Sequence, residues 1–172
     1  DNGYDGPGAG RAPEVAALGS YGHFRGPPPA RVALVRDAVS KLPSTVRDLF
    51  LYAADEDCGE RAGPAWQAVL RDEGLAARVR VLHTCNDDPR GQTVDMVMMS
   101  ADGFQTDAAV EARRMGRPVW AYNGAAPRAG TLVLDGDLTS LRASGWIAAS
   151  RPVGRWFLWE TTFWNDDNRG GK

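Results

Sequence analysis

An adjacent pair of acids, Asp55 and Glu56, follows directly on an apolar run in the segment LFLYAADED. Two carboxylates that lie close together repel each other, so one of them can keep its proton and serve as a general acid. Glycoside hydrolysis needs such an acid on the leaving oxygen, together with a second group that stabilises or attacks the anomeric carbon. The same acids, with Asp57, would also suit a solvated loop in which one carboxylate caps the next helix. Asp55 and Glu56 are therefore candidate catalytic residues, with the capping loop as the alternative.

A further carboxylate follows an apolar run near the end of the chain. Residues 156–159, Trp-Phe-Leu-Trp, end directly on Glu160, and Trp164 lies four residues further on. Aromatic rings stack on the apolar faces of pyranoses, so Trp159 and Trp164 are candidate sugar-binding residues. Glu160 could bind sugar hydroxyls, pair with a nearby arginine, or act as the nucleophile of a two-carboxylate retaining glycosidase. In that last case it would lie about 5–5.5 Å from Glu56.

Short apolar runs alternate with helical patterns along the chain. The predicted strands span residues 49–55, 78–84, 95–101, 118–123 and 155–160. The predicted helices span residues 30–42, 63–74, 104–116 and 138–154. The link over residues 85–94 has no helical period, so we expect a loop there. This alternation is typical of a parallel sheet built from βα units.

Each predicted strand ends in hydrogen-bonding or ionisable groups. Functional residues of parallel sheets gather at the carboxyl ends of the strands. Besides the acids already described, these ends contain His83-Thr84-Cys85-Asn86-Asp87, Ser100-Ala101-Asp102 and Tyr122-Asn123. Some of this polarity is expected from turns and helix caps. We nevertheless expect a shared polar site, with Tyr122 and Asn123 as candidate substrate-binding residues.

Composition excludes several classes of function. The chain has 172 residues and a formal net charge of −2, which disfavours nucleic acid as the main partner because phosphate binding needs a basic surface. No run of about 18 apolar residues is present, so we expect no membrane span. The two cysteines, Cys58 and Cys85, could pair or be free. His83 and His23 are not arranged as metal ligands, and we expect no metal and no cofactor.

Two α/β architectures fit this pattern. One is a five-stranded doubly wound domain, and the other is the C-terminal part of a (βα)8 TIM-type barrel with about five parallel strands. No Gly-rich phosphate loop follows any predicted strand, which weakens the doubly wound interpretation. The aromatic residues at the strand ends favour a sugar site and therefore the barrel. We assign the partial barrel to residues 31–172, and we expect residues 1–30, which are rich in Gly and Pro, to form a loop.

Three segments carry a resemblance to a known family. They are LFLYAADED, GRPVWAYNGAAPRAGTLVLD with the following Arg/Trp helix, and GRWFLWETTFWNDDNRGG. Together they resemble the catalytic domain of glycoside hydrolase family 123 and its relatives, long described as a domain of unknown function. The resemblance covers residues 45–165 and lies in the order of these motifs along the chain. It implies a (βα)8 barrel behind a β-sandwich, of which this chain would supply strands four to eight. The missing N-terminal strands of the same parent chain would then be its structural partner.

The resemblance also implies an activity and roles for particular residues. Family members remove β-linked N-acetylgalactosamine from chain ends, with the 2-acetamido oxygen of the substrate attacking the anomeric carbon. Asp55 would orient the acetamido nitrogen, and Glu56 would act first as acid and then as base. The candidate subsite residues would be Tyr122, Asn123, Trp159, Glu160 and Trp164. The resemblance further suggests a secreted or cell-surface protein with a carbohydrate substrate.

Two other functions remain open on the sequence. A non-catalytic carbohydrate-binding barrel would use the same aromatic residues to bind sugar, without transferring a proton. Such a protein would tolerate the substitution Glu56→Gln, whereas a hydrolase would not. A small doubly wound domain without a determinable activity is the third interpretation.

Overall fold

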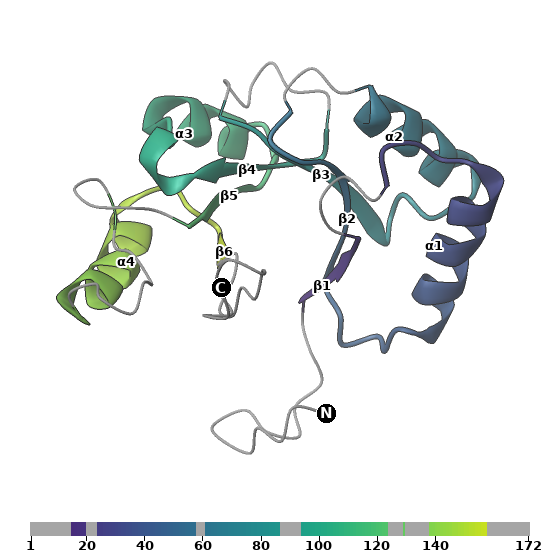
Figure 1. The fold of residues 1–172 in the computed structure, drawn as a ribbon, viewed down its shortest axis with the longest axis horizontal. Coiled ribbons are helices and arrows are strands. Elements are labelled where there is room, and N and C mark those ends of the chain that lie inside the picture. The colour runs from purple at the N-terminus through teal and green to yellow at the C-terminus, as the bar shows by residue number, and fades with distance from the viewer. Residues whose placement is uncertain are drawn as a thin grey trace, which may run out of the picture. The chain divides into compact units, whose positions relative to one another are not determined.

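The computed structural model describes residues 15–19, 24–57, 61–86, 94–123, 129 and 138–157 (Figure 1). Within these ranges the chain is an α/β protein with six strands, four α-helices and one short 3-10 helix. It divides into two compact units. Unit 1 comprises residues 1–83 and 93–95, and unit 2 comprises residues 84–92 and 96–172.

Unit 1 is built on three parallel strands, β1 (Val15–Leu18), β2 (Asp48–Ala54) and β3 (Val79–Thr84). Their order in the sheet follows their order in the chain. Ala17 of β1 pairs with Phe50 of β2, and Leu51 of β2 pairs with Val81 of β3. Five of the seven residues of β2 are buried, including the three consecutive residues 49–51. A strand that is covered on both faces needs a continuous apolar run, which explains the segment LFLYAA.

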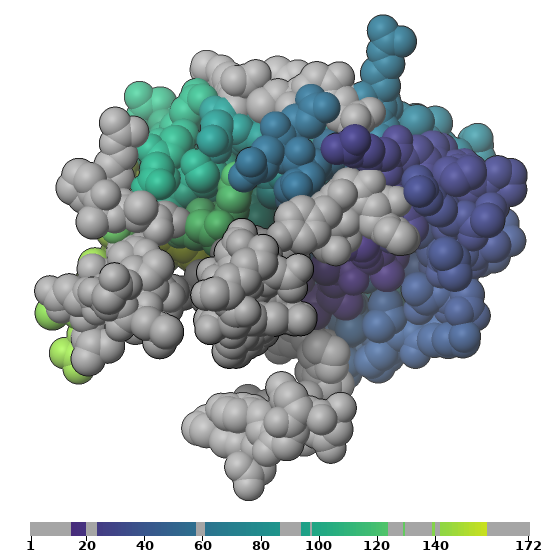
Figure 2. Space-filling view, in the orientation of Figure 1, coloured from purple at the N-terminus to yellow at the C-terminus, as the bar shows by residue number. Residues whose placement is uncertain are grey.

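Two helices accompany these strands, α1 (Pro29–Lys41) and α2 (Ala62–Asp72). Proline stands at the start of α1, where its fixed φ suits the first turn and its missing N–H costs nothing. Most of α1 is exposed, and Figure 2 shows it in blue-purple on the surface of unit 1. The last turn of α2 is followed by Gly74 at φ +70°, a left-handed conformation that glycine adopts without strain.

An aromatic contact joins α2 to the segment that follows β1. Trp66 of α2 is fully buried, and its indole N–H donates to the backbone oxygen of Phe24 at 2.5 Å. The ring of Phe24 meets the indole edge-on, with the ring centroids 5.6 Å apart. A Cβ atom at Gly19, just after β1, would come within 2.2 Å of the Phe24 ring. Phe24 therefore connects the end of β1 to the core of unit 1.

Unit 2 contains β4 (Met96–Ser100), the 3-10 helix η1 (Ala101–Gly103), α3 (Thr106–Arg114), β5 (Val119–Tyr122), α4 (Leu138–Ser150) and β6 (Trp156–Phe157). The strands are parallel and lie in the order β4-β5-β6 (Figure 1). Val119 of β5 pairs with Val97 of β4, and Tyr122 of β5 pairs with Phe157 of β6. All four residues of β5 are buried.

The structure confirms the α/β class, and each of the five predicted strands has a counterpart, β2 to β6. The four predicted helices also occur, with ends that differ by a few residues. The prediction of loop for residues 1–30 is wrong at Val15–Leu18, which form β1. The pairing of these four residues with β2 and the burial of Phe24 outweigh the Gly- and Pro-rich composition around them. The predicted extension of the last strand to Glu160 lies outside the described residues.

Among the residues that the structure describes, no helix combines the length and the apolar character needed to cross a membrane.

Candidate functional site

The acids Asp55 and Glu56 stand immediately after the carboxyl end of β2 in unit 1. Asp55 is half-buried, whereas Glu56 is exposed to solvent. The hydroxyl of Tyr52 donates to Oδ1 of Asp55 at 2.5 Å. A hydrogen bond from a hydroxyl to a carboxylate is short and strong, and it fixes the orientation of the carboxylate. The pair therefore combines one oriented carboxyl group with one that is exposed to solvent.

An irregularity in β2 explains how Tyr52 reaches Asp55. Side chains three residues apart in a regular strand point to opposite faces of the sheet. The register of β2 with β3 shifts between Tyr52, which pairs with Leu82, and Ala54, which pairs with His83. A shift of this kind breaks the alternation of side chains and redirects those that follow. The irregularity at the end of the strand thus brings the hydroxyl and the carboxylate to the same side.

The backbone at Glu56 adopts a left-handed conformation with φ +49°. An L-residue in this region costs about 1–3 kcal/mol, and such residues cluster at binding and catalytic sites. The other described non-glycine residue with a positive φ is Asn123, also at φ +49°, directly after β5. Asparagine tolerates this conformation better than glutamate does. Glu56 is therefore the more strained of these two strand ends.

The predicted substrate-binding residues Tyr122 and Asn123 lie in unit 2, at the carboxyl end of β5. Asn123 is tied to β6 through its backbone: its N–H donates to the oxygen of Phe157 at 3.1 Å, and its oxygen accepts from Nε1 of Trp156 at 2.9 Å. Tyr122 is only 8% exposed, so protein encloses most of its ring. Trp159, Glu160 and Trp164 lie outside the described residues, and their proposed roles stay predictions.

His83 and Cys85, at the end of β3, are both buried. A Cβ atom at Gly63 would lie only 2.6 Å from Nε2 of His83, so the close packing of α2 on this histidine requires glycine. Cys85 is disulfide-bonded. The sequence allowed either a paired or a free cysteine here, and the structure excludes the free thiol. The chain's one other cysteine is Cys58, which follows the acidic pair in the sequence and lies outside the described residues.

Replacing Cys85 by serine is expected to lower the free energy of unfolding by about 2–4 kcal/mol, the typical contribution of a disulfide. The bond restricts the unfolded chain, so its loss stabilises the unfolded state. Urea unfolding of the wild type and the variant would measure the difference. Labelling with a thiol reagent in denaturant without reductant is the control. A labelled thiol in the wild type would contradict the disulfide on which this prediction depends.

Within the described ranges, no group of three or more His, Cys, Asp or Glu side chains is placed to hold a metal ion.

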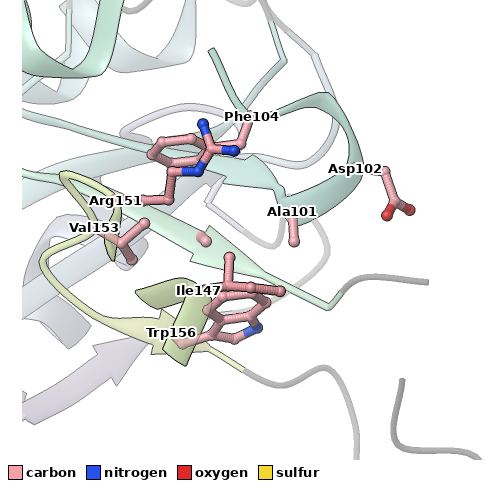
Figure 3. Close-up of a pocket in the computed structure, with 8 residues that line it drawn as sticks. Ala101, Asp102, Phe104, Ile147, Arg151, Val153 and Trp156 are labelled. Carbon is pink, nitrogen blue, oxygen red and sulfur yellow. The ribbon is translucent and has the colours of Figure 1, made fainter. Parts of the chain in front are cut away.

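A pocket of about 250 Å³ lies in unit 2, and its lining includes Ala121 of β5 but neither Tyr122 nor Asn123. Four large apolar side chains line it: Phe104, Ile147, Val153 and Trp156. Two charged side chains also line it, Asp102 after β4 and Arg151 after α4. Figure 3 shows these two charged groups on opposite sides of the view, with Ile147 and Trp156 below them.

Two residues that these arrangements use, Tyr52 and Arg151, could not be predicted from the sequence. Tyr52 reads as one more apolar residue of a buried strand, and its spacing of three from Asp55 argues against contact in a regular strand. Arg151 follows α4 and reads as an ordinary surface charge after a helix. A register shift and a pocket between separate segments both depend on tertiary structure, so neither residue carries a signal in the sequence.

No protein-family model matches the chain, and no curated protein matches it significantly. The resemblance to glycoside hydrolase family 123 therefore stays a prediction.

Proposed function

We propose that this chain is a glycoside hydrolase-like domain that removes β-linked N-acetylhexosamine, of the N-acetylgalactosamine type, from the ends of glycans. Asp55 and Glu56 are its catalytic residues. The observation that carries the proposal is the presence of an oriented carboxyl group and a solvent-exposed carboxyl group side by side at one strand end. Asp55 accepts a hydrogen bond from Tyr52, while the adjacent Glu56 is exposed in a left-handed conformation.

Substrate assistance needs two different carboxyl groups. One must hold the acetamido group so that its carbonyl oxygen can attack the anomeric carbon, and a carboxylate fixed by a neighbouring donor suits this task. Asp55 takes this role by accepting the acetamido N–H. The other must give a proton to the leaving oxygen and then remove one from the attacking water. Glu56 takes this role because its side chain is open to solvent, from which both the glycan and the water arrive.

The strand order supports the barrel rather than the doubly wound alternative. A doubly wound sheet reverses its strand order at a switch point, and ligands bind there. Three consecutive strands lie side by side in chain order in unit 1, and three do so in unit 2. Successive neighbours of this kind are the rule in a (βα)8 barrel, where the active site lies at the carboxyl ends of the strands. Asp55 and Glu56 stand at such an end.

Hydrolysis of an aryl β-N-acetylgalactosaminide by the natural full-length protein tests the proposal, with the matching aryl β-galactoside as control. Turnover of the acetamido sugar alone is the expected result, because only that sugar carries the attacking oxygen. Turnover of both sugars, lost in the variant Glu160→Gln, would instead indicate a two-carboxylate mechanism that uses Glu56 and Glu160. Turnover of neither, with sugar binding retained, would indicate a carbohydrate-binding protein that is not an enzyme.

A further inference from the structure

The pocket of unit 2 has the size of a site for one small molecule. Its volume of about 250 Å³ lies just below the range of about 300–1,000 Å³ that is typical of sites for drug-sized ligands. A single sugar residue or a molecule of similar size would fill the pocket, whereas an oligomer would be too large to fit. Its lining residues come from four separate segments of unit 2, around β4, β5, α4 and β6.

The apolar part of the lining suits a flat ligand surface. The rings of Phe104 and Trp156 and the branched side chains of Ile147 and Val153 supply this surface. The indole of Trp156 is held in place because its Nε1–H donates to the backbone oxygen of Asn123 at 2.9 Å. A ring that is fixed in this way offers its apolar surface at a low entropic cost. The C–H face of a pyranose is a matching partner.

The charged part of the lining adds two kinds of recognition. Nη1 of Arg151 donates to Oγ1 of Thr106 at 2.5 Å, which anchors the guanidinium beside the first turn of α3. A guanidinium carries five N–H groups, so donors remain for a carboxylate of the ligand. Asp102, which lies apart from Arg151 in Figure 3, is an acceptor for ligand hydroxyls. A neutral sugar has no charged group for the guanidinium of Arg151, and a purely apolar acid has no hydroxyl to donate to Asp102.

We propose that this pocket binds a single hexuronate, a pyranose that carries a carboxylate. The carboxylate lies against Arg151, hydroxyls donate to Asp102, and the apolar ring face packs against Trp156. This inference rests on the proposed function for its choice of a carbohydrate, but it concerns a separate site from Asp55 and Glu56. It gives unit 2 a binding role of its own, selective for acidic monosaccharides.

Ligand-observed NMR titration with sodium glucuronate tests the proposal on the natural full-length protein. Glucose, which lacks the carboxylate, and benzoate, which lacks the hydroxyls, are the comparison ligands. We expect glucuronate to bind at least about tenfold more tightly than either, because a hydrogen bond to a charged group contributes that much. The substitution Arg151→Ala should weaken glucuronate binding by about tenfold or more.

Arg142→Ala is the matched control, because Arg142 is an exposed residue of α4, the helix that Arg151 follows, and it does not line the pocket. It should leave glucuronate binding unchanged. Asp102→Asn, at an exposed position, gives a second variant that should still fold and that should weaken the binding of glucuronate more than that of benzoate. Equal binding of glucuronate by the wild type and by Arg151→Ala would overturn the proposal, as would benzoate binding as tightly as glucuronate.

The variant Glu56→Gln separates this proposal from the proposed function. It should bind glucuronate like the wild type, because Glu56 belongs to unit 1 and does not line the pocket. Glucuronate binding without any hydrolysis by the wild type would support the pocket and overturn the proposed function. Hydrolysis that needs Glu56, without glucuronate binding, would support the proposed function and overturn the pocket.

Discussion

Replacing Glu56 by glutamine is expected to lower kcat for an aryl β-N-acetylgalactosaminide by about 10²–10⁴-fold, the usual contribution of a general acid–base group. A glutamine amide has nearly the shape of the carboxyl group, but it cannot give a proton to the leaving oxygen or remove one from water. The loss should depend on the leaving group. A phenol of low acidity needs protonation as it leaves, so its glycoside should suffer most, and a nitrophenol should suffer least.

The same substitution should leave the fold intact. The Glu56 side chain is exposed, and glutamine meets the same backbone restriction at φ +49° as glutamate does. Glycine at this position should remove the strain and raise the free energy of unfolding by about 1 kcal/mol, while it also abolishes turnover. A variant that is inactive and more stable would be typical of a position held in its conformation for function. Thermal melts followed by circular dichroism would measure both variants.

Asp57→Asn is the matched control for this experiment. Asp57 is exposed and follows Glu56 directly, but it has no role in the proposed mechanism. Its replacement by asparagine also removes one carboxylate. It should retain turnover within a few-fold of the wild type. Equal losses in Asp57→Asn and Glu56→Gln would mean that the negative charge of the loop matters rather than a proton from one residue. Full activity in Glu56→Gln would exclude Glu56 as the acid.

The sequence predicted β2 to β6 because each is an apolar run bounded by helical patterns or turns. β2, which is buried on both faces, is the clearest instance. It could not predict β1, because a strand of four residues beside many glycines and prolines carries little signal of its own. β1 forms because β2 offers an edge with which it can pair and because Phe24 packs on Trp66. Both β2 and Trp66 are distant from β1 in the sequence.

The candidate site shows the same division between local and distant information. The position of Asp55 and Glu56 at a strand end follows from the local pattern, and the structure places them there. The contact between Tyr52 and Asp55 depends on a shift in the pairing of β2 with β3, which no local pattern reports. The disulfide of Cys85 could not be predicted either, because the presence of two cysteines in a sequence does not show whether they are bonded.

Replacing Trp66 by alanine is expected to lower the free energy of unfolding by about 3–5 kcal/mol, the usual cost of removing a large buried aromatic side chain. Trp66 is fully buried, so its removal leaves a cavity in the core of unit 1. It also removes the hydrogen bond from the indole N–H to the backbone oxygen of Phe24, and the loss of this buried bond adds to the cost.

The substitution Trp66→Phe separates these two contributions. Phenylalanine keeps most of the apolar surface and the edge-on contact with Phe24, but it lacks the N–H donor. We expect a smaller loss of about 1–3 kcal/mol, because the buried hydrogen bond to the Phe24 oxygen is lost. Urea unfolding followed by far-UV circular dichroism suits the wild type and both variants. Tryptophan fluorescence is less suitable, because both substitutions remove a tryptophan. If Trp66→Ala were as stable as the wild type, the contact between α2 and Phe24 would not hold unit 1 together. β1, which is tied to that contact through Gly19 and Phe24, would then need another anchor.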